Sequence, residues 1–407
     1  DLAVHLKDMS VGITIEETLI PILLYADDVV ILANDESEMQ KMLTIVNKWC
    51  DQWKMKVNMS KTKVMHFREK KVNQCVKEIY LGRQVVEYTD CYKYLGVYFN
   101  PFLDFEDHCK VLTEAGTRAL GAVIAKLRID ENLMYATYTK CIDSSVYPVV
   151  EYGSEVWGYV TNSCTDQVQL KAIRAYLGVN KFAPNLAIMG EMGWIPSHIR
   201  RKLCMLRYWN RLVKLDDERL TKKIFLAEHG NHGKWCSAVK NLFAEFGCLE
   251  LYDSMSECDL SWFREKMLDK YCSDWKSDIA TKPKLRTYVK LKEEYGVEKY
   301  IQLNLSRSQR SLLAQIRLGI LPLAIETGRY TRTKIENRIC TLCNAHKVED
   351  DVHFLFKCDF YKTERSNFIK CIRNIGLSYS LADNLKLICN AHPRLLSKYI
   401  SKIWMKR

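Results

Sequence analysis

Two short apolar runs flank a pair of aspartates near the start of the chain. Residues 22–32 read ILLYADDVVIL, with Asp27 and Asp28 at the centre. Apolar runs on either side of a polar turn are typical of a β-hairpin, and we expect its strands to be largely buried. An ordinary solvated turn explains the two aspartates, because aspartate tolerates turn geometry. Alternatively, the carboxylates bind a divalent cation, which neutralises two negative charges held side by side.

Over residues 1–103, the spacing of the apolar residues is in turn that of strands and that of a helix. Alternating apolar residues near Ile13 predict a strand before the hairpin. After the hairpin, Asp35 and Glu38 form a capping-box pattern at the start of a predicted helix. The apolar positions of this helix are Met39, Met42, Leu43, Val46, Trp49 and Trp53. A strand after residues 57–63, a hairpin near residues 83–87 and a strand over residues 92–99 follow, which predicts an α+β sheet domain with a helix on one face.

From about residue 105 the pattern is helical. Residues 148–158 read as an irregular aromatic connector, and residues 166–177 as a helix ended by Gly178. A later helix carries Arg307, Arg310 and Arg317 and ends near Gly319. We therefore expect a mostly α-helical region after the sheet domain.

The composition says more about the class of partner that the chain binds than about its fold. The chain has 407 residues, 48% hydrophobic and 27% charged, with a net charge of +12. That charge favours a polyanion such as nucleic acid, although an anionic membrane surface also fits. No apolar run approaches the roughly 18–20 residues of a transmembrane helix, so we expect no membrane partner.

The number and distribution of the cysteines indicate the redox state of the cellular compartment. Sixteen cysteines are scattered along the chain, with no signal peptide before them. This predicts free thiols in a reducing, intracellular setting, cytoplasmic or nuclear and not secreted. The chain also begins at Asp1 and enters regular structure within about twenty residues, so we expect an amino-terminally truncated fragment.

Arginine alternates with aromatic residues in residues 200–211, as in Arg200, Arg201 and Trp209. This pattern suits contacts to phosphates and bases. The alternative is a solvated face over an aromatic core, and we favour it for any single patch.

A cysteine–histidine cluster lies near the carboxyl end. Cys340, Cys343, His353 and Cys358 have the spacing C-x2-C-x9-H-x4-C and supply the three thiolates and one imidazole of a structural zinc site. Chance proximity of buried thiols is the alternative, and His346 and Cys371 are possible competing ligands. Four basic residues precede the cluster and suit nucleic-acid binding: Arg329, Arg332, Lys334 and Arg338.

These motifs together resemble the reverse transcriptases of non-LTR (LINE-type) retrotransposons. Tyr25-Ala26-Asp27-Asp28 resembles the catalytic palm hairpin, and Tyr94-Leu95-Gly96-Val97 resembles the strand that grips the primer end. Between them, a block similar to one in the family comprises Trp53, Asn58, Lys61, Thr62 and Met65. Residues 148–157 and the cysteine–histidine module are also similar to segments that follow the polymerase in such elements.

The resemblance implies an RNA-directed DNA polymerase that uses RNA template, DNA primer or target and dNTPs, with DNA integration as the wider role. Asp27 and Asp28 would bind Mg²⁺ or Mn²⁺ in a two-metal site, and Lys61 would lie near the triphosphate. Tyr25, Tyr94, Leu95 and Gly96 would contact or position the primer.

The resemblance also implies four parts. They are a partial palm (1–103), a thumb-like helical region (104–180), a helical connector (181–305) and a basic region with the zinc-knuckle-like module (306–407). The family's fingers and another palm aspartate are missing, so we expect the chain to be inactive alone. The alternative is a non-catalytic, zinc-containing RNA- or DNA-binding protein derived from such an element.

Overall fold

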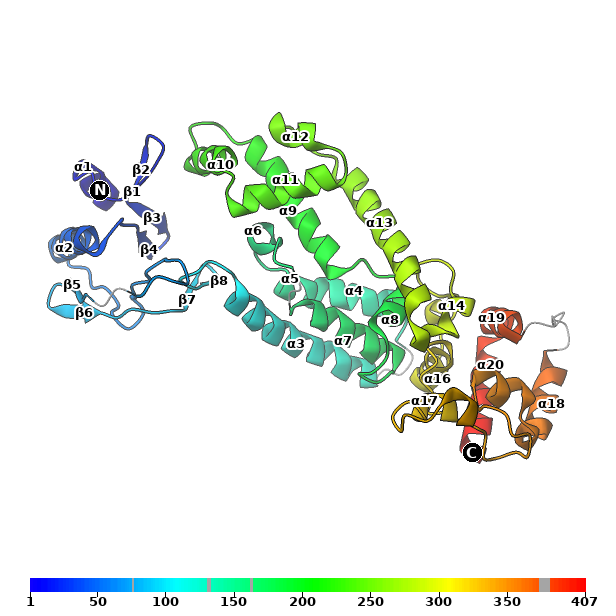
Figure 1. Ribbon diagram of the computed structural model, residues 1–407. Helices are drawn as coiled ribbons and strands as arrows, with labels where there is room; N and C mark the ends of the chain where they lie inside the picture. Colours follow the sequence, from blue (N-terminus) through cyan, green and yellow to red (C-terminus); the bar gives the residue numbers. More distant parts are fainter. Residues whose placement is uncertain (75–76, 130–132, 162–163, 373–380) are drawn as a thin grey trace. The chain divides into compact units, whose positions relative to one another are not determined.

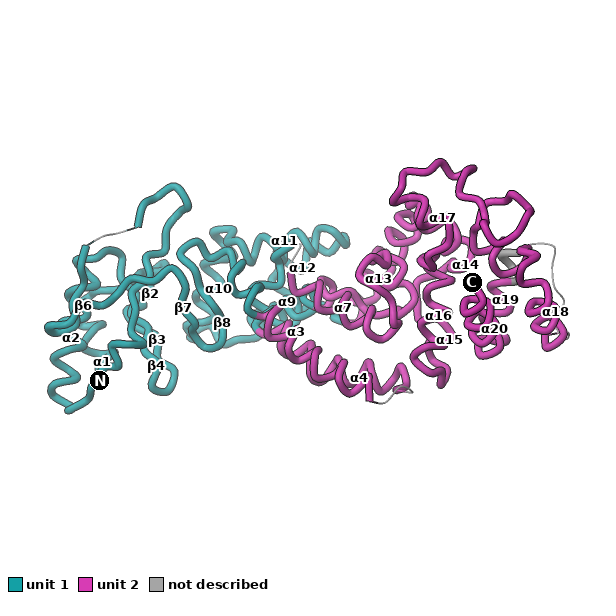
Figure 2. Tube along the Cα trace, turned by 90° about the horizontal axis from the view of Figure 1, so that it is seen from below, with its two compact units in different colours: residues 1–111, 153–161, 201–260 teal, residues 112–152, 162–200, 261–407 magenta. Residues whose placement is uncertain are grey.

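The computed structural model describes residues 1–74, 77–129, 133–161, 164–372 and 381–407 (Figure 1). It divides into two compact units that are discontinuous along the chain (Figure 2). The first contains residues 1–111, 153–161 and 201–260, and the second contains residues 112–152, 162–200 and 261–407. The unit boundaries fall inside helices α3 (Glu106–Ile129), α9 (Ser197–Val213) and α13 (Leu260–Thr281). The four-part division expected from the sequence stays a prediction.

The first unit begins with short hairpins around one long helix. Its elements up to residue 99 are α1 (Leu2–Asp8), β1 (Ile13–Ile15), β2 (Thr18–Ile20), β3 (Ile22–Tyr25), β4 (Asp28–Ile31), α2 (Glu36–Trp53), β5 (Ile79–Leu81), β6 (Gln84–Val86), β7 (Tyr92–Tyr94) and β8 (Val97–Phe99). Among the described residues, every sheet has only two strands, and each pair is antiparallel.

The hairpin predicted around Asp27 and Asp28 is present as β3 and β4, but the expectation that its strands are largely buried was wrong. Leu24, Tyr25 and Val29 are 56%, 62% and 46% exposed. Only the base of the hairpin joins the core, through Ile22 and Ile31, whereas the residues toward its tip lie beyond that core.

Two other strand predictions also differ from the structure. Residues 92–99 form two strands and not one, because Leu95 and Gly96 take positive φ angles of 47° and 84° and reverse the chain. The segment after residue 57 makes only an isolated parallel bridge, between Val64 and Tyr88. Residues 148–158, expected to be irregular, contain the one-turn helices α5 (Tyr147–Val150) and α6 (Ser154–Trp157).

Helix α2 organises the amino-terminal core. Asp35 caps it by accepting from the Glu38 N–H at 2.8 Å, as predicted. The reciprocal bond of a capping box is replaced, because the Glu38 carboxylate accepts from the N–H groups of Gly12 and Asn34. The apolar face of the helix buries Met42, Leu43 and Val46 against strands β5 and β6. The Gln40 side chain both donates to the carbonyl of Tyr80 and accepts from its N–H, which ties the helix to β5.

The helical part of the first unit surrounds a buried tryptophan. Its remaining helices are α10 (Leu220–Gly230), α11 (Lys234–Glu245) and α12 (Leu249–Asp253). Trp209 of α9 is fully buried among Phe225, Phe243 and Tyr252. The aromatic residues of this segment therefore form core, as the favoured alternative predicts. Arg201, 1% exposed, lies over the ring of Trp157 and is not part of a solvated face.

The second unit is helical among its described residues. Its other elements are α4 (Tyr135–Ser145), α7 (Asp166–Leu177), α8 (Asn185–Met192), η1 (Pro283–Leu285), α14 (Tyr288–Leu291), α15 (Lys299–Gln302), α16 (Arg307–Arg317), α17 (Ala324–Thr327), η2 (Ile335–Asn337), η3 (His353–Lys357), η4 (Asp359–Tyr361), α18 (Lys362–Cys371), α19 (Leu381–Ala391) and α20 (Pro393–Lys406). Helix α7 ends at Gly178 in the left-handed conformation, with φ 68°, as predicted.

A buried ion network joins three helices of this unit. Arg317 of α16 is 1% exposed and donates to Glu191 of α8 at 2.9 and 3.0 Å. It also contacts Glu298, before α15, at 3.0 Å. Tyr300 donates to the same Glu191 carboxylate at 2.7 Å. Burial alone would lower the pKa of Arg317, but the two carboxylates more than offset it and raise that pKa.

The predicted fold class holds in outline: short hairpins near the amino terminus precede a largely helical chain. Among the described residues, no helix combines the length and apolar character needed to cross a bilayer.

Arg317→Ala is expected to lower the free energy of unfolding of the second unit by about 3–5 kcal/mol, because it leaves Glu191 buried without its cation. Urea denaturation followed by circular dichroism measures this loss. The matched control is Lys386→Ala, which removes a 2.7 Å ion pair with Glu293 near the surface and should cost less than about 1 kcal/mol. Equal losses in the two variants would contradict the assignment.

Candidate metal centres

The two central aspartates lie at the exposed tip of the β3–β4 hairpin. Tyr25 pairs with Asp28 across the strands, and Ala26 and Asp27 form the two-residue turn. Ala26 takes a positive φ of 51°, uncommon for a residue with a side chain. Both aspartates are exposed, so their oxygens are accessible to a cation and its water shell.

The β7–β8 turn lies close to this tip. Its central residues, Leu95 and Gly96, both have positive φ, as a two-residue hairpin turn with the twist of its strands requires. Burial and then the negative charge of Asp28 raise the pKa of Tyr94. The phenol of Tyr94 is therefore near enough to Asp28 to sense its charge.

Lys61 is connected to the same strand. The hydroxyl of Tyr92 in β7 donates to the Lys61 carbonyl at 2.9 Å. Hydrogen bonds to the Asn58 carbonyl from Lys61 and Thr62 form the turn that carries this lysine, whose side chain is exposed. Strand β7 thus carries Tyr94 and, through the Tyr92 hydroxyl, contacts the turn that carries Lys61. The sequence pattern did not single out Tyr92.

Asp27 and Asp28, which the resemblance predicts to bind metal, are not joined by a third potential ligand in the part of the chain that the structure describes. Among the described residues, the only group of three or more potential metal ligands is the cysteine–histidine cluster. Asp1 caps helix α1 and Asp8 is the last residue of that helix, so neither aspartate lies on a strand. Two carboxylates alone leave most of the octahedral shell of Mg²⁺ to water.

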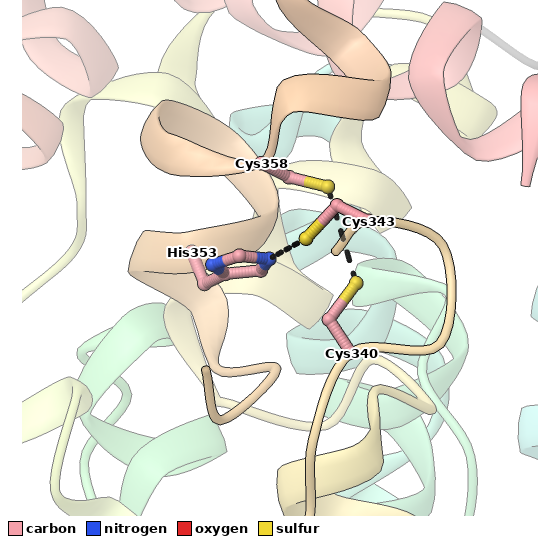
Figure 3. A group of neighbouring side chains, drawn as sticks. All are labelled: Cys340, Cys343, His353 and Cys358. Carbon is pink, nitrogen blue, oxygen red and sulfur yellow. Dashed lines mark hydrogen bonds between the residues drawn. The ribbon is translucent and has the colours of Figure 1, made fainter. Parts of the chain in front are cut away.

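The cysteine–histidine cluster is assembled as the spacing predicts (Figure 3). One donor atom from each of Cys340, Cys343, His353 and Cys358 lies within 4.8 Å of the others. The Cys340 and Cys358 sulfurs are 3.9 Å apart, and Cys343 Sγ is 3.4 Å from His353 Nε2. Tetrahedral zinc with ordinary bond lengths requires about 3.8 Å between sulfurs and about 3.6 Å from sulfur to nitrogen. The four residues therefore fit Zn²⁺, whereas His346 and Cys371 are not part of the group.

Local backbone structure places these four side chains. An antiparallel bridge between Ile339 and Val348 closes the loop that carries the first two cysteines. His353 and Cys358, five residues apart, lie on one π-helical turn in which the Cys358 N–H donates to the His353 carbonyl at 2.8 Å. Asp350 accepts from the His353 N–H at 2.7 Å and holds the start of that turn. An aspartate three residues before the histidine was the available sequence signal for this role.

Burial sets the charge state of the cluster. It raises the pKa of Cys340 and raises that of Cys358 to about 12, and it lowers the pKa of His353. Neutral imidazole is the form that coordinates metal, and a bound cation would offset the cost of buried thiolates.

The four predicted basic residues divide into two kinds. Arg338 is committed to the fold, since it donates to the carbonyls of Thr333 and Ile325 at 2.9 and 2.7 Å. Arg329 contacts Glu326 at 3.4 Å. Arg332 and Lys334 are exposed, and their side chains make no hydrogen bond or ion pair among the described residues. Their nucleic-acid contacts stay predictions.

Comparison with known proteins assigns the amino-terminal segment. Residues 6–99 match the family described as reverse transcriptase (RNA-dependent DNA polymerase). These residues belong to the reverse transcriptase family. They include the β3–β4 hairpin, the Lys61 turn and the β7–β8 turn, and the predicted resemblance is thereby confirmed.

The relatives are reverse transcriptases of non-LTR retrotransposons. The chain is 27% identical over 161 residues to the probable RNA-directed DNA polymerase from transposon BS of Drosophila melanogaster, covering 37% of this chain and 17% of the relative. It is 23% identical over 278 residues to the Pol polyprotein of the type-1 element R1 of Nasonia vitripennis, covering 60% and 81%. The polymerase from mobile element jockey of Drosophila melanogaster is 22% identical over 173 residues, covering 40% and 19%. The chain thus spans less than a fifth of two of these relatives.

Purified chain is expected to hold one zinc ion, measured by elemental analysis. Cys343→Ser should lose it and lower the free energy of unfolding by about 4 kcal/mol or more, because the free energy of zinc binding no longer stabilises the folded state. His346→Ala and Cys371→Ser are the matched controls and should keep both zinc and stability. Substoichiometric zinc in the parent, with Cys343→Ser unchanged in stability, would rule out the site.

Proposed function

We propose that this chain provides part of the palm of a non-LTR retroelement reverse transcriptase, together with a carboxy-terminal region that binds nucleic acid. The observation that carries the proposal is the match of residues 6–99 to the reverse transcriptase family. This segment contains both the acidic hairpin tip and the predicted primer-gripping turn, and the negative charge of Asp28 contributes to raising the pKa of Tyr94.

The proposed chemistry is RNA-templated DNA synthesis. Asp27 and Asp28 hold divalent metal, which when bound lowers the barrier to attack by the primer hydroxyl and stabilises charge on the phosphoryl group. Tyr94, Leu95 and Gly96 position the primer end. Lys61, exposed on a turn anchored to β7, binds the incoming triphosphate.

The incomplete carboxylate set decides what this chain does by itself. Asp27 and Asp28 have no third carboxylate partner among the described residues, and Mg²⁺ requires near-ideal octahedral coordination. The polymerase activity therefore depends on further ligands from outside the described part of this chain.

Primer extension by this chain alone is expected to be undetectable beside an active reverse transcriptase as positive control. Weak Mn²⁺ binding, on the order of millimolar, should nevertheless be measurable by electron paramagnetic resonance. Asp28→Asn should abolish it, and Asp51→Asn on helix α2 should not. Mg²⁺-dependent extension that disappears in Asp28→Asn would contradict the expectation.

A second candidate function is a zinc-containing nucleic-acid-binding protein without chemistry. The incomplete carboxylate set favours it, together with the unpaired cations Arg332 and Lys334 beside the zinc cluster.

Salt dependence tests the nucleic-acid binding that both functions require. About four phosphate contacts to a single strand predict an affinity loss of about 10- to 100-fold between 50 and 200 mM salt, because each contact releases condensed counterions. Fluorescence anisotropy with a labelled RNA measures it. An affinity that does not change with salt would count against both functions.

A further inference from the structure

The loop shortly before the zinc ligands in sequence has an exposed tyrosine. Tyr330, 74% exposed, lies in the loop between α17 and η2. The Thr333 N–H donates to the Gly328 carbonyl at 2.8 Å and closes the loop. The Arg338 side chain packs so tightly over Gly328 that a Cβ there would lie 2.6 Å from its Cδ. These two contacts, the frame of the loop, fix the segment that carries the exposed ring.

A second exposed ring lies in the connection between α7 and α8. Phe182 is 63% exposed, and its N–H donates to the Asn180 side chain at 2.9 Å. Lys181 Nζ lies 5.2 Å from the centre of the ring. Lys284 donates to the Phe182 carbonyl at 2.9 Å, which brings η1 to the same place. Single exposed rings are common on protein surfaces, so a shared function requires contacts that hold the two segments together.

A chain of charged contacts connects the rings. Glu326, 6% exposed, lies 3.9 Å from Lys284 and 3.4 Å from Arg329, the residue before Tyr330. Burial lowers the pKa of Lys284, the negative charge of Glu326 raises it, and the positive charge of Arg329 lowers it further. Arg286 approaches Glu326 as well, at 3.9 Å. One buried carboxylate thus faces three cations.

The loop carries further positive charge after its tyrosine. Arg332 and Lys334 are exposed, and the only acid between residues 329 and 338 is Glu336. Three cations share Glu326, and the side chains of Arg332 and Lys334 have no described partner, so positive charge is in excess near the rings. Exposed rings with excess positive charge match the requirements of a single-stranded nucleic acid, in which unpaired bases stack and phosphates bind cations. A duplex offers its phosphates but keeps its base faces stacked.

We propose that Tyr330 and Phe182 are stacking platforms for bases of a single-stranded nucleic acid, RNA or DNA, whose phosphates contact Lys284, Arg329, Arg332 and Lys334. This inference rests on the nucleic-acid binding proposed above and assigns it a place and a strand type. It gives the exposed rings a function that the basic residues alone do not supply.

Fluorescence anisotropy with a labelled single strand of about 12 nucleotides tests the platforms. Tyr330→Ala and Phe182→Ala are each expected to weaken binding about 5-fold or more, because each removes a base stack. Tyr330→Trp and Phe182→Tyr should retain parental affinity. The salt slope should stay unchanged in the ring variants and decrease by about 0.7 per cation in Arg332→Gln and Lys334→Gln.

Two controls isolate stacking from charge. An abasic strand of equal length keeps the phosphates, so Tyr330→Ala and the parent should bind it equally. Tyr80→Ala removes an exposed tyrosine whose hydroxyl donates to Glu78, in acidic surroundings, and should bind the normal strand as the parent does. Zinc content and the urea transition, unchanged in every variant, verify folding.

The outcomes separate the two proposals. Parental affinity of Tyr330→Ala and Phe182→Ala for the normal strand overturns the platforms, while salt-dependent binding by the parent leaves the proposed function standing. A loss on the abasic strand as large as that on the normal strand also overturns stacking. A parent that binds no strand in a salt-dependent manner overturns the proposed function itself.

Discussion

The buried guanidinium of Arg317 is the contact on which the second unit depends most. It brings α16 against Glu191 of α8 and Glu298 before α15, segments more than a hundred residues apart in sequence in the first case. An arginine is suited to this position because its planar group donates in several directions while staying charged. Removing either partner leaves a charge in the core, so the three segments are held in one arrangement.

The same helix connects that network to the zinc cluster. Helix α16 packs along α20, whose Tyr399 donates to the Leu355 carbonyl in the π-helical turn at 2.6 Å. At the end of α20, Arg407 pairs with the buried Glu349 beside the first cysteine loop. The geometry of the four zinc ligands is therefore supported from the helical core, and the frame around Tyr330 shares that support through Arg338, whose carbonyl accepts from the Glu349 N–H at 2.9 Å.

Charge is used in opposite ways in the two halves of the molecule. In the second unit, buried arginines such as Arg310 and Arg317 have carbonyl or carboxylate partners and stabilise the fold. At the β3–β4 tip, Asp27 and Asp28 are exposed, and no further described carboxylate joins them to form a ligand group. Exposed, incompletely matched charge is available for a ligand, and the same holds for Arg332 and Lys334.

The hairpin at Asp27 and Asp28, the capped helix after it and the four-residue zinc set were predictable from the sequence, because each depends on local spacing. A two-residue turn, an N-cap and a C-x2-C pair are determined over a few residues. The predicted single strand over residues 92–99 failed because a turn with positive φ at Leu95 overrode its aromatic and apolar pattern.

Burial and partnership were decided only by the tertiary structure. The sequence does not distinguish Arg317, sealed among carboxylates, from Arg332, open to solvent, because both are arginines in basic segments. The effect of the Asp28 charge on the pKa of Tyr94 joins segments far apart in the chain, and so do the contacts that lead from Phe182 through Lys284 and Glu326 to Arg329. The sequence alone determined the resemblance of residues 6–99 to reverse transcriptases and the candidate ligands. Long-range packing decided which charged side chains are paired within the fold and which stay exposed and can bind a partner.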